Sequence, residues 1–507
     1  MFLVSRWRTR AIIALALSLV FALSSTLLAF AAEPLIQISS DPYHNPTSNH
    51  KTEVEPDTFA FGNTIVSTFQ VGRFFDGGGS NIGFATSTNG GATWTHGFLP
   101  SSTVFATPPG KYPRGSDASV AYDAKHKVWM ISWLGIISPS GPVDVVVSRS
   151  TNGGLSWGAP VVVNATGEFN DKNWTVCDDS ASSPFFGNCY TEFDNASSIN
   201  RVQMSTSTDG GKTWGSALTT PDKACVIGGQ PLVQPNGTVI VPIDDCFETA
   251  VLSFRSTDGG KSWSRTVLAA QILFDGDPGA IRSGPLPTAE IDKSGRVYVV
   301  WSDCRFEAAC SAPIGTNDLV LISSADGIHW TLPKRIPISP VGSGADHFIP
   351  GLAVDRSTSG SSAHLGLAYY YYPNSNCTFN TCKLDVGFIS STNGGASWSA
   401  AEQLAGPMTL TWLPLTTQGF MVADYISTSI VPGDDDATPV FEVARPPTGT
   451  SSCSNLSTGA PGQNCHQATF TSSEDVLKII GGTNVSNAQA PSNLPNKPGL
   501  SAPATAF

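Results

Sequence analysis

Short runs of mostly hydrophobic residues recur along this chain, and each run is bounded by glycine, asparagine, aspartate or serine. Within many of them hydrophobic and polar residues alternate, which is the period of a half-buried β-strand. Six runs that end at a polar turn occupy residues 81–87, 144–150, 201–207, 251–256, 318–324 and 385–391. Two further runs precede each of them, for example 56–62 and 64–70 in the first group. The pattern predicts an all-β protein with little helix.

The turn that follows each run is one eight-residue motif in six copies. The copies are STNGGATW (87–94), STNGGLSW (150–157), STDGGKTW (207–214), STDGGKSW (256–263), SSADGIHW (323–330) and STNGGASW (391–398). Successive copies begin 49 to 68 residues apart, a spacing that suits a four-stranded propeller blade with one turn signal in each unit. We therefore expect a β-propeller of four-stranded blades.

The third position of the turn is aspartate in two copies, Asp209 and Asp258, and asparagine in three. These two residues replace each other freely where only a hydrogen-bond acceptor is needed, such as a side-chain oxygen that caps backbone N–H groups. The glycines supply positive φ angles, and the closing tryptophan can be buried between neighbouring sheets. We interpret the turn as a structural element rather than a catalytic one.

After the sixth turn the strand pattern continues through residues 424–433, 438–445 and 466–473 without a seventh turn. That last unit lacks a fourth strand, and the run PLIQISS at 34–40 is expected to supply it and to close the ring. Closure removes exposed sheet edges. Seven blades are preferred, with six as the alternative, and residues 33–472 form the propeller.

The first 32 residues resemble a secretory leader, with three arginines, an apolar stretch and the sequence Ala29-Phe30-Ala31 as a cleavage site. We expect a secreted protein with no membrane span after the leader is removed, and a retained N-terminal anchor is the alternative. The chain from 473 to 507 is rich in Asn, Pro, Ala and Ser, and we expect it to be disordered.

Charge and cysteine content narrow the class of protein further. The formal net charge is −12 and only 13% of residues are charged, which excludes a nucleic-acid partner because clustered Lys and Arg are absent. Ten cysteines fall into five neighbouring couples: 177/189, 225/246, 304/310, 377/382 and 453/465. An even number of cysteines in an exported chain favours disulfides, and we expect these local pairs. No cofactor and no metal are expected.

The turn motif resembles the Asp box, S-x-D-x-G-x-x-W, of the sialidase-like or BNR-repeat propellers, and the resemblance covers most of the chain. It implies that Arg73 binds substrate, that Asp76 is the general acid/base, and that Asp117 lies near the substrate. The arginine motif that grips the substrate carboxylate in sialidases is missing, because TEVEPDTFAFG with Glu55 and Asp57 stands in its place. The superfamily also contains other glycosidases, polysaccharide lyases and binding propellers, so the reaction does not follow from the resemblance.

Five further residues are candidates for the site. Arg305 and Arg445 end strands as Arg73 does, and the three guanidinium groups together could bind an anionic group of the substrate. Tyr425 is the candidate nucleophile by the resemblance, with Glu248 as the carboxylate that activates it. His347 could take part in binding. Each has a structural alternative, such as a packed arginine, a satisfied buried tyrosine, a solvated loop acid or an aromatic core.

Our leading hypothesis is an exported sialidase-like glycoside hydrolase whose partner is a glycan or glycoconjugate. A non-catalytic propeller that binds glycan or protein is the alternative, and a polysaccharide lyase is the third. Whether the chain is an enzyme is left open by the sequence, with a glycosidase favoured.

Overall fold

The computed structural model describes residues 34–308, 310, 315–473 and 477–485. They belong to one compact unit that begins at Pro34, and the expected leader at 1–32 lies outside the described residues. In the described part the helices are four short 3-10 turns, η1 (Ala196–Ser198), η2 (Pro278–Ala280), η3 (Gly360–Ser362) and η4 (Leu410–Trp412). None of the helices found there has the length and hydrophobicity needed to cross a membrane. The prediction of an all-β fold is confirmed.

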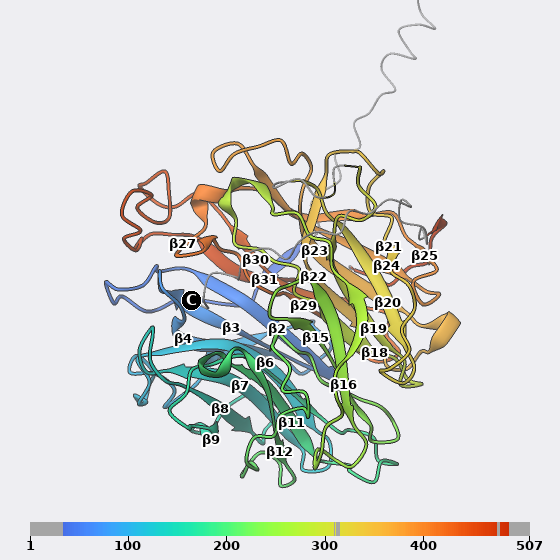
Figure 1. Ribbon diagram of the computed structural model, residues 1–507. Coiled ribbons are helices and arrows are strands. Elements are labelled where there is room, and N and C mark those ends of the chain that lie inside the picture. Colours follow the sequence, from blue (N-terminus) through green and yellow to red (C-terminus); the bar gives the residue numbers. More distant parts are fainter. Residues whose placement is uncertain (1–33, 309, 311–314, 474–476, 486–507) are drawn as a thin grey trace, which may run out of the picture. The chain divides into compact units, whose positions relative to one another are not determined.

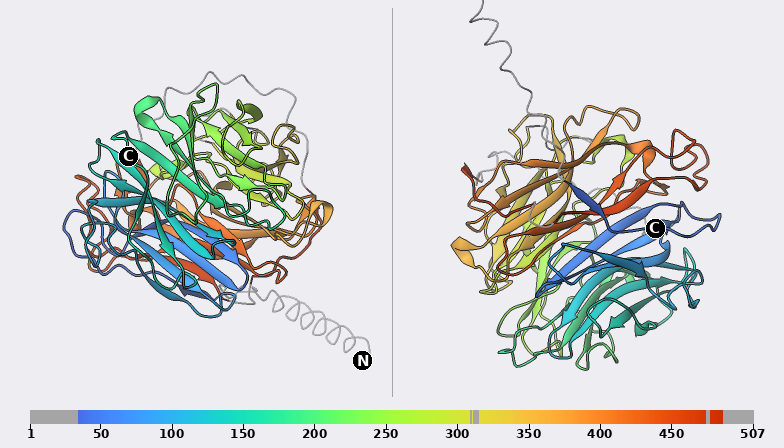
Figure 2. Two further views of the ribbon diagram at one scale, coloured as in Figure 1. Left: turned by 90° about the horizontal axis from the view of Figure 1, so that it is seen from below. Right: turned by 180° about the vertical axis from the view of Figure 1, so that it is seen from behind.

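The first sheet contains eight antiparallel strands. These strands lie side by side in Figure 1, and Figure 2 shows them from behind. Its strands are β2 (Glu53–Phe61), β3 (Thr64–Arg73), β4 (Gly79–Ser87), β5 (Thr95–Phe98), β6 (Arg114–Asp123), β7 (Val128–Ile136), β8 (Val143–Ser150) and β9 (Val161–Asn164). It consists of two consecutive meanders, β2 to β5 and β6 to β9. A single residue pair, Gly79 with Gly115, joins them.

The middle of the chain folds into three further sheets. One has three strands, β10 (Asn170–Cys177), β11 (Cys189–Asn195) and β12 (Arg201–Ser207). The next contains β13 (Val226–Ile227), β14 (Leu232–Val233), β15 (Val239–Asp245), β16 (Ala250–Ser256) and β17 (Val267–Gln271). The third contains β18 (Thr288–Ile291), β19 (Val297–Asp303), β20 (Asp318–Ser324) and β21 (Lys334–Arg335).

The last part of the chain supplies two four-stranded sheets and two short pairs. The first sheet holds β22 (Asp346–Val354), β23 (Leu365–Tyr372), β24 (Lys383–Ser391) and β26 (Glu402–Thr409). The second holds β29 (Ser427–Ile430), β30 (Ala437–Ala444), β31 (Gln467–Ser472) and β1 (Leu35–Gln37). The pairs are β25 (Ser397–Trp398) with β32 (Asn484–Val485), and β27 (Leu415–Thr416) with β28 (Gly419–Phe420).

The first strands of consecutive meanders lie next to one another and close a circle. Contacts run from β2 to β6, β10, β14, β18, β22 and β29 in turn, and β29 contacts β2. The N-terminal strand β1 pairs antiparallel with β31, Leu35 opposite Ser472. This confirms that the run at 34–40 completes the last sheet. The architecture is a β-propeller.

The division into seven separate four-stranded blades, or into six, needs correction. Five sheets have four or more strands, and a sixth has three. Two physical causes account for the difference. The Gly79–Gly115 pair fuses two meanders into one sheet, and the turn at 207–214 is followed by the isolated bridge of Met204 with Leu218 instead of an outer strand.

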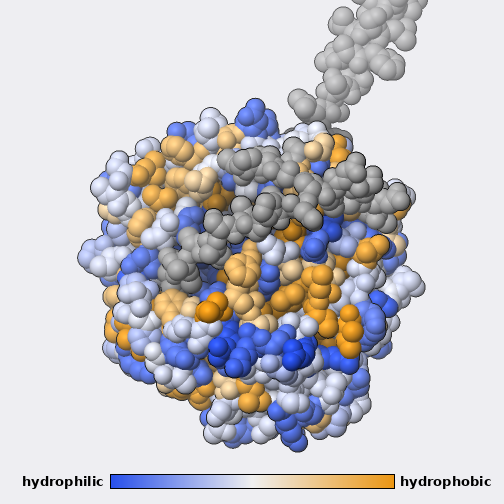
Figure 3. All heavy atoms as spheres, viewed as in Figure 1, coloured by the Kyte–Doolittle hydropathy of each residue, from blue (hydrophilic) through white to orange (hydrophobic). Residues whose placement is uncertain are grey.

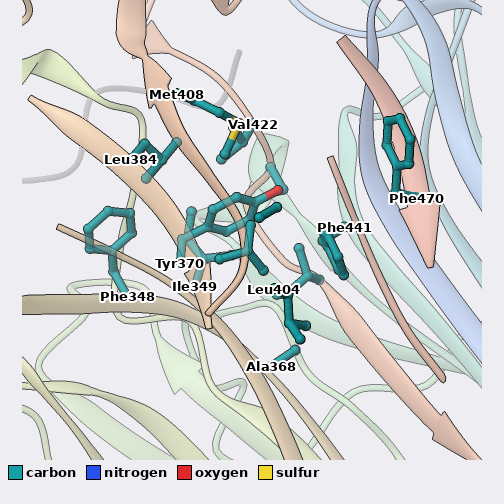
Figure 4. Close-up of a cluster of buried hydrophobic side chains, with 14 of the residues drawn as sticks. Phe348, Ile349, Ala368, Tyr370, Leu384, Leu404, Met408, Val422, Phe441 and Phe470 are labelled. Atoms are coloured by element: carbon teal, nitrogen blue, oxygen red, sulfur yellow. The ribbon is translucent and has the colours of Figure 1, made fainter. Parts of the chain in front are cut away.

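The core lies between neighbouring sheets. The largest cluster joins side chains from β22, β23, β24, β30 and β31, among them Phe348, Phe441 and Phe470 (Figure 4). Tyr370 lies in the same cluster and fixes the two sheets to each other, because its hydroxyl donates to the Glu442 carbonyl at 2.9 Å and accepts from the Glu442 N–H at 2.8 Å. Burial of apolar side chains at about 25 cal/mol per Å² supplies the driving force for this packing.

The six turns have the geometry expected of structural elements. In the copy at 391–398, Asn393 Oδ1 accepts from the Ser397 N–H at 2.9 Å and from the Ser391 hydroxyl at 3.0 Å. The Ser391 hydroxyl oxygen in turn accepts from the Gly395 N–H at 3.1 Å, with Gly395 at a φ of 77°. Trp398 is fully buried. Asp258 makes the equivalent contact to the Ser262 N–H at 3.0 Å, which explains why aspartate and asparagine are interchangeable.

All five local cysteine pairs are disulfides, as predicted: 177–189, 225–246, 304–310, 377–382 and 453–465. The last three pairs close the loops between β19 and β20, β23 and β24, and β30 and β31. The pair Cys225–Cys246 links the segment before β13 to the loop after β15, which becomes important at the site.

Part of the expected disordered tail is ordered. Leu477 and Ile479 are buried, the Ala437 N–H donates to the Leu477 carbonyl, and β32 pairs with β25. These two apolar side chains fill the gap beside β30, which corrects the predicted disorder for residues 477–485. The rest of the tail, 474–476 and 486–507, lies outside the described residues.

The exchange of Asp and Asn in the turn gives a first prediction. Replacing Asn393 by Asp will leave the free energy of unfolding nearly unchanged, because Oδ1 still accepts from the Ser397 N–H. Replacing Asn393 by Ala will lower the free energy of unfolding by about 1–2 kcal/mol, because the Oδ1 acceptor is lost. Denaturant unfolding of both variants measures the difference. Equal loss in both would show that the side-chain amide, which donates to the Ser397 hydroxyl at 2.9 Å, matters at this position rather than the Oδ1 acceptor.

Candidate functional site

The first strands β2, β6 and β10 each contain a bulge, as does β22 between Phe348 and Pro350, where the buried Ile349 has a φ of 49°. The pairing register shifts between Val54 and Asp57 in β2, between Ser116 and Ser119 in β6, and between Asp171 and Trp174 in β10. Inside each bulge one residue has a positive φ: Glu55 (55°), Asp117 (45°) and Lys172 (49°). A bulge re-aims a side chain, and a left-handed backbone at a residue other than glycine carries strain that often marks a functional site.

These three side chains face one cavity of about 800 Å³. Its other charged lining residues are Arg73 at the end of β3, Asp171 on β10, Glu248 in the loop after β15, and Arg282 and Asp424 from segments before β18 and β29. The cavity therefore collects ionic groups from sequence positions about 370 residues apart. Apolar residues complete the lining: Phe169, Ile199, Ile227, Phe247, Ile281 and Leu286.

Asp424 is the centre of the charge cluster in the cavity. Its Oδ1 accepts from Arg282 Nε at 2.5 Å, and its Oδ2 accepts from Arg282 Nη2 and from Lys172 Nζ, the latter at 2.5 Å. Lys172 Nζ also lies 3.3 Å from Asp117 Oδ1, whose second oxygen accepts from the Ser116 hydroxyl at 2.6 Å. The cluster thus connects the first strands of several meanders through one buried ionic network.

A second branch of the cluster runs through Glu55. Its Oε1 lies 4.0 Å from Arg282 Nη2, and its Oε2 accepts from Gln70 Nε2. Gln70 Oε1 accepts in turn from Arg73 Nη1 at 3.2 Å. Burial and the neighbouring Arg282 lower the pKa of Arg73 to about 10, so the guanidinium stays charged at neutral pH.

The acidic side chains of the cavity differ sharply in acidity. Burial, followed by the negative charge of Asp424, raises the pKa of Glu248 to about 7. Burial and the charges of Asp117 and Asp424 raise the pKa of Glu55 to about 8. Burial would also raise the pKa of Asp424, but Arg282 and Lys172 outweigh it and hold that pKa far below the usual range. Groups whose environments separate their pKa values in this way are suited to acid–base catalysis.

The backbone of the loop that carries Glu248 is held in place by hydrogen bonds. The loop between β15 and β16 is fastened by Asp245, whose Oδ1 accepts from the Thr249 N–H at 2.7 Å and the Ala250 N–H at 3.1 Å. Glu248 itself has a φ of 54°. A Cβ added to Gly284 would lie 3.0 Å from Glu248 Oε1, so the absence of a side chain at Gly284 makes room for this carboxyl.

Of the eight site residues expected from the sequence, Arg73, Asp117 and Glu248 line the cavity. The other five, Asp76, Tyr425, Arg305, Arg445 and His347, are not among its lining residues. The roles of all eight, catalytic for Asp76, Tyr425 and Glu248 and substrate-binding for the other five, stay predictions.

Asp76 is paired with Arg114, at 2.6 Å between Asp76 Oδ1 and Arg114 Nη1, and its side chain is 44% exposed. Tyr425 packs edge-on against Trp174, and its hydroxyl lies 3.5 Å from the Ala118 carbonyl oxygen. Burial and the charge of Glu55 raise the pKa of Tyr425 well above its usual value. Formation of a tyrosinate there is therefore opposed.

The expected convergence of Arg73, Arg305 and Arg445 on one anionic group is not observed. Arg305 forms an ion pair with Asp303 at 2.7 Å and lies over the Trp301 ring. Arg445 is exposed and lies over the Phe470 ring. The guanidinium groups of Arg305 and Arg445 each contact a residue in the same or the adjacent strand. The position of an arginine at a strand end therefore did not predict where its side chain points.

His347 is likewise a core residue. It stacks on Tyr371, contacts Tyr369 edge-on, and its Nδ1 lies 3.2 Å from the Asn317 carbonyl oxygen. Burial lowers the pKa of His347 to about 4, so the ring is neutral at physiological pH. Its surroundings are thus those of the alternative stated for the sequence, an aromatic core.

Sequence reasoning missed Arg282 entirely. It lies in the irregular segment before β18, where no strand pattern or motif distinguishes it. In the sequence no motif marks Lys172 or Asp424; Lys172 follows Asp171, and Asp424 precedes the candidate nucleophile Tyr425. The repeated bulge is the signal that unites Glu55, Asp117 and Lys172, and it depends on strand register rather than on residue type.

One group of side chains in the described part of the chain has the spacing of metal ligands away from the cavity. Ligand atoms of Asp355, His364 and Asp435 lie within 4.8 Å of one another. Asp355 already accepts from the Ser357 N–H and hydroxyl, both at 2.8 Å. The second such group contains Cys304 and Cys310, which are joined in a disulfide.

No model of a known protein family matches the sequence, and no curated protein matches it. Among solved structures it is similar to the leech intramolecular trans-sialidase (12% identity, 68% of each chain, TM-score 0.46). It is also similar to an ulvan lyase of a new polysaccharide lyase family (10% identity, 87% of this chain and 96% of that one, TM-score 0.49). A third is the intramolecular trans-sialidase of Ruminococcus gnavus (14% identity, 87% and 98%, TM-score 0.43). Sialidases are thus among the structures that this propeller resembles, as the turn motif predicted.

The charge cluster gives a second prediction. Replacing Lys172 by Met will leave the buried carboxylates of Asp117 and Asp424 without this cation, and the free energy of unfolding will fall by about 3–5 kcal/mol. Lys111 provides the matched control: its side chain is 63% exposed and pairs with Asp144 at 3.1 Å. Its replacement by Met will cost less than about 1 kcal/mol. Chemical denaturation at pH 8 compares the two, and similar losses would show that the cluster contributes no more than a surface pair.

Proposed function

We propose that this protein is a glycoside hydrolase in which Glu248 is the general acid. The observation that carries the proposal is the pKa of Glu248, raised to about 7 in a cavity where a second carboxylate, Asp424, is held ionised by Arg282 and Lys172. A carboxyl that keeps its proton near neutral pH can donate it to a leaving group. The cavity volume of about 800 Å³ is within the range of small-ligand sites.

The proposed reaction divides two roles between two carboxyl groups. Glu248 donates its proton to the glycosidic oxygen while the bond from that oxygen to the anomeric carbon breaks, and both bonding electrons stay on the oxygen. Water then adds to the anomeric carbon and gives one proton to Asp117, which Ser116 and Lys172 hold in position. Glu248 regains a proton from solvent as Asp117 releases its own, so the sum is addition of one water across one glycosidic bond.

This proposal replaces the acid and the nucleophile that the resemblance implies. Asp76 is engaged with Arg114 and does not line the cavity. Tyr425 is buried, its pKa is raised, and four carboxyl groups oppose its ionisation. Arg73 stays a proposed substrate-binding residue, because it lines the cavity and its Nε makes no hydrogen bond although it is buried.

We further propose that the protein acts outside the cell. Its five disulfides are the supporting observation, because such bonds persist in oxidising compartments. A glycan or glycoconjugate is the proposed partner.

The role of Glu248 is tested by screening the purified protein against aryl and alkyl glycosides of common neutral sugars, uronic acids and sialic acid. On a substrate that is cleaved, Glu248→Gln will lower kcat about 100-fold or more, because the amide cannot donate the proton. The loss will be smaller for a nitrophenyl leaving group, which departs without protonation. Asp434→Asn, at an exposed position outside the cavity, serves as the control and will keep full activity.

Two outcomes would reject this function. Full activity of Glu248→Gln on alkyl glycosides would remove Glu248 from the mechanism. Binding of glycans without cleavage of any of them would favour the non-catalytic propeller instead.

The pH profile gives a separate prediction. The active form carries the proton on Glu248, whose pKa is about 7, so kcat/KM will fall tenfold per pH unit above that pH. In Glu248→Gln this descending limb will be absent. A profile that rises through pH 7 would mean that Glu248 acts as a base rather than as an acid.

A further inference from the structure

Six of the residues that line the cavity are large and apolar, and we call them the apolar wall. They come from three places: Phe169 and Ile199 beside the third meander, Ile227 and Phe247 in the fourth, and Ile281 with Leu286 before β18. The charged residues Glu55, Arg73, Asp117 and Lys172 come from β2, β3, β6 and β10. Glu248 and Arg282 directly follow Phe247 and Ile281 in the chain, so that these two charged groups adjoin the apolar wall.

Two of these apolar side chains are exposed to an unusual degree. Ile199 is 80% exposed and Phe247 is 52% exposed. Leaving large apolar groups in water is unfavourable. The two rim residues thus offer apolar surface that a ligand in the cavity could cover. Figure 3 shows, for one face of the molecule, how hydrophobic residues border strongly hydrophilic ones.

The backbone at Ile199 is strained. Its φ is 59° and its ψ is 57° at the end of η1, a conformation that β-branched residues strongly avoid. Asparagine or glycine would occupy this position at lower cost, and Asn200, the next residue, has a φ of 44°. A strained backbone conformation of this kind recurs at binding sites. Strain and exposure coincide at the same residue.

Phe247 is the sequence neighbour of the proposed acid. It precedes Glu248 in the loop after β15, and Cys246 before it is bonded to Cys225. Both cysteines line the cavity. Cys225 forms an isolated bridge with Arg201, which begins β12 two residues after Ile199. The disulfide therefore couples the loop of Phe247 and Glu248 to the segment that carries Ile199.

We propose that this apolar wall is the leaving-group subsite, and that the substrate is a glycoside with an apolar aglycone such as an alkyl, lipid or aryl group. The inference rests on the proposed role of Glu248. A general acid protonates the oxygen between the sugar and its leaving group, so the surface next to the acid on the leaving-group side sets the preference for that group. Beside Glu248 the surface is Phe247 and the apolar residues that the Cys225–Cys246 disulfide holds near it. The sugar occupies the charged side, where Arg73 and Asp117 lie.

The inference is tested by the affinities of paired ligands that differ only in the aglycone. Octyl and methyl glycosides of glucose, galactose and N-acetylneuraminic acid are titrated calorimetrically below their micelle-forming concentrations. The octyl member of at least one pair will bind about tenfold more tightly or better, because the chain covers apolar surface. Phe247→Ala will lower this ratio at least about threefold. Ile199→Asn will lower it too, while the thermal midpoint of this variant stays level or rises because asparagine accepts the left-handed backbone.

Leu332→Ala is the matched control, because Leu332 is 78% exposed and does not line the cavity. It will leave the octyl-to-methyl ratio unchanged. Equal affinities of the octyl and methyl members in all pairs, or an unchanged ratio in both rim variants, would overturn the subsite. Because the readout is binding, the two proposals fail separately. A preserved preference without hydrolysis rejects the hydrolase and keeps the apolar subsite, whereas hydrolysis without a preference does the reverse.

Discussion

The ionic network around Asp424 is the constraint on which the rest of the site depends. Lys172 and Arg282 bind this carboxylate from β10 and from the segment before β18, and Lys172 reaches Asp117 on β6 as well. Burying these charges is costly, and the cost is offset only when each charge has its partners in good geometry. The network therefore fixes the relative positions of strands from distant parts of the chain. Burial raises the pKa of Glu248, and the negative charge of Asp424 in this network raises it further, while Lys172 partly opposes the shift.

Strand bulges explain how charged residues enter a β-sheet core at this point. The first strands are largely buried, and in a regular strand alternate side chains point to opposite faces of the sheet. The bulges in β2, β6 and β10 break that alternation at Glu55, Asp117 and Lys172. The six turns act at the opposite ends of the meanders, and their hydrogen bonds stay within the turn or support the next sheet. Stability and chemistry are thus assigned to different ends of the same strands.

Much of the fold could be predicted from sequence because its signals are local. The turn motif located the strands that lead to it, the cysteine couples gave all five disulfides, and the orphan run at the N-terminus gave the pairing of β1 with β31. The number of separate sheets could not be predicted, because it depends on the single contact between Gly79 and Gly115. Of the predicted site residues, Arg73, Asp117 and Glu248 line the cavity. Asp76, Tyr425, Arg305, Arg445 and His347 do not line it, because neither residue type nor position in a strand determines which neighbour a side chain will pack against.

The proposed role of Glu248 as general acid requires that this carboxyl is protonated near neutral pH, because of burial and the charge of Asp424. The most direct measurement is a carboxyl-carbon NMR titration of protein labelled with ¹³C at glutamate side chains, with the Glu248 signal assigned from the Glu248→Gln variant. We expect the Glu248 signal to titrate with a pKa of about 7. A value close to 4.5, the ordinary glutamate pKa, would contradict this and remove Glu248 as the general acid.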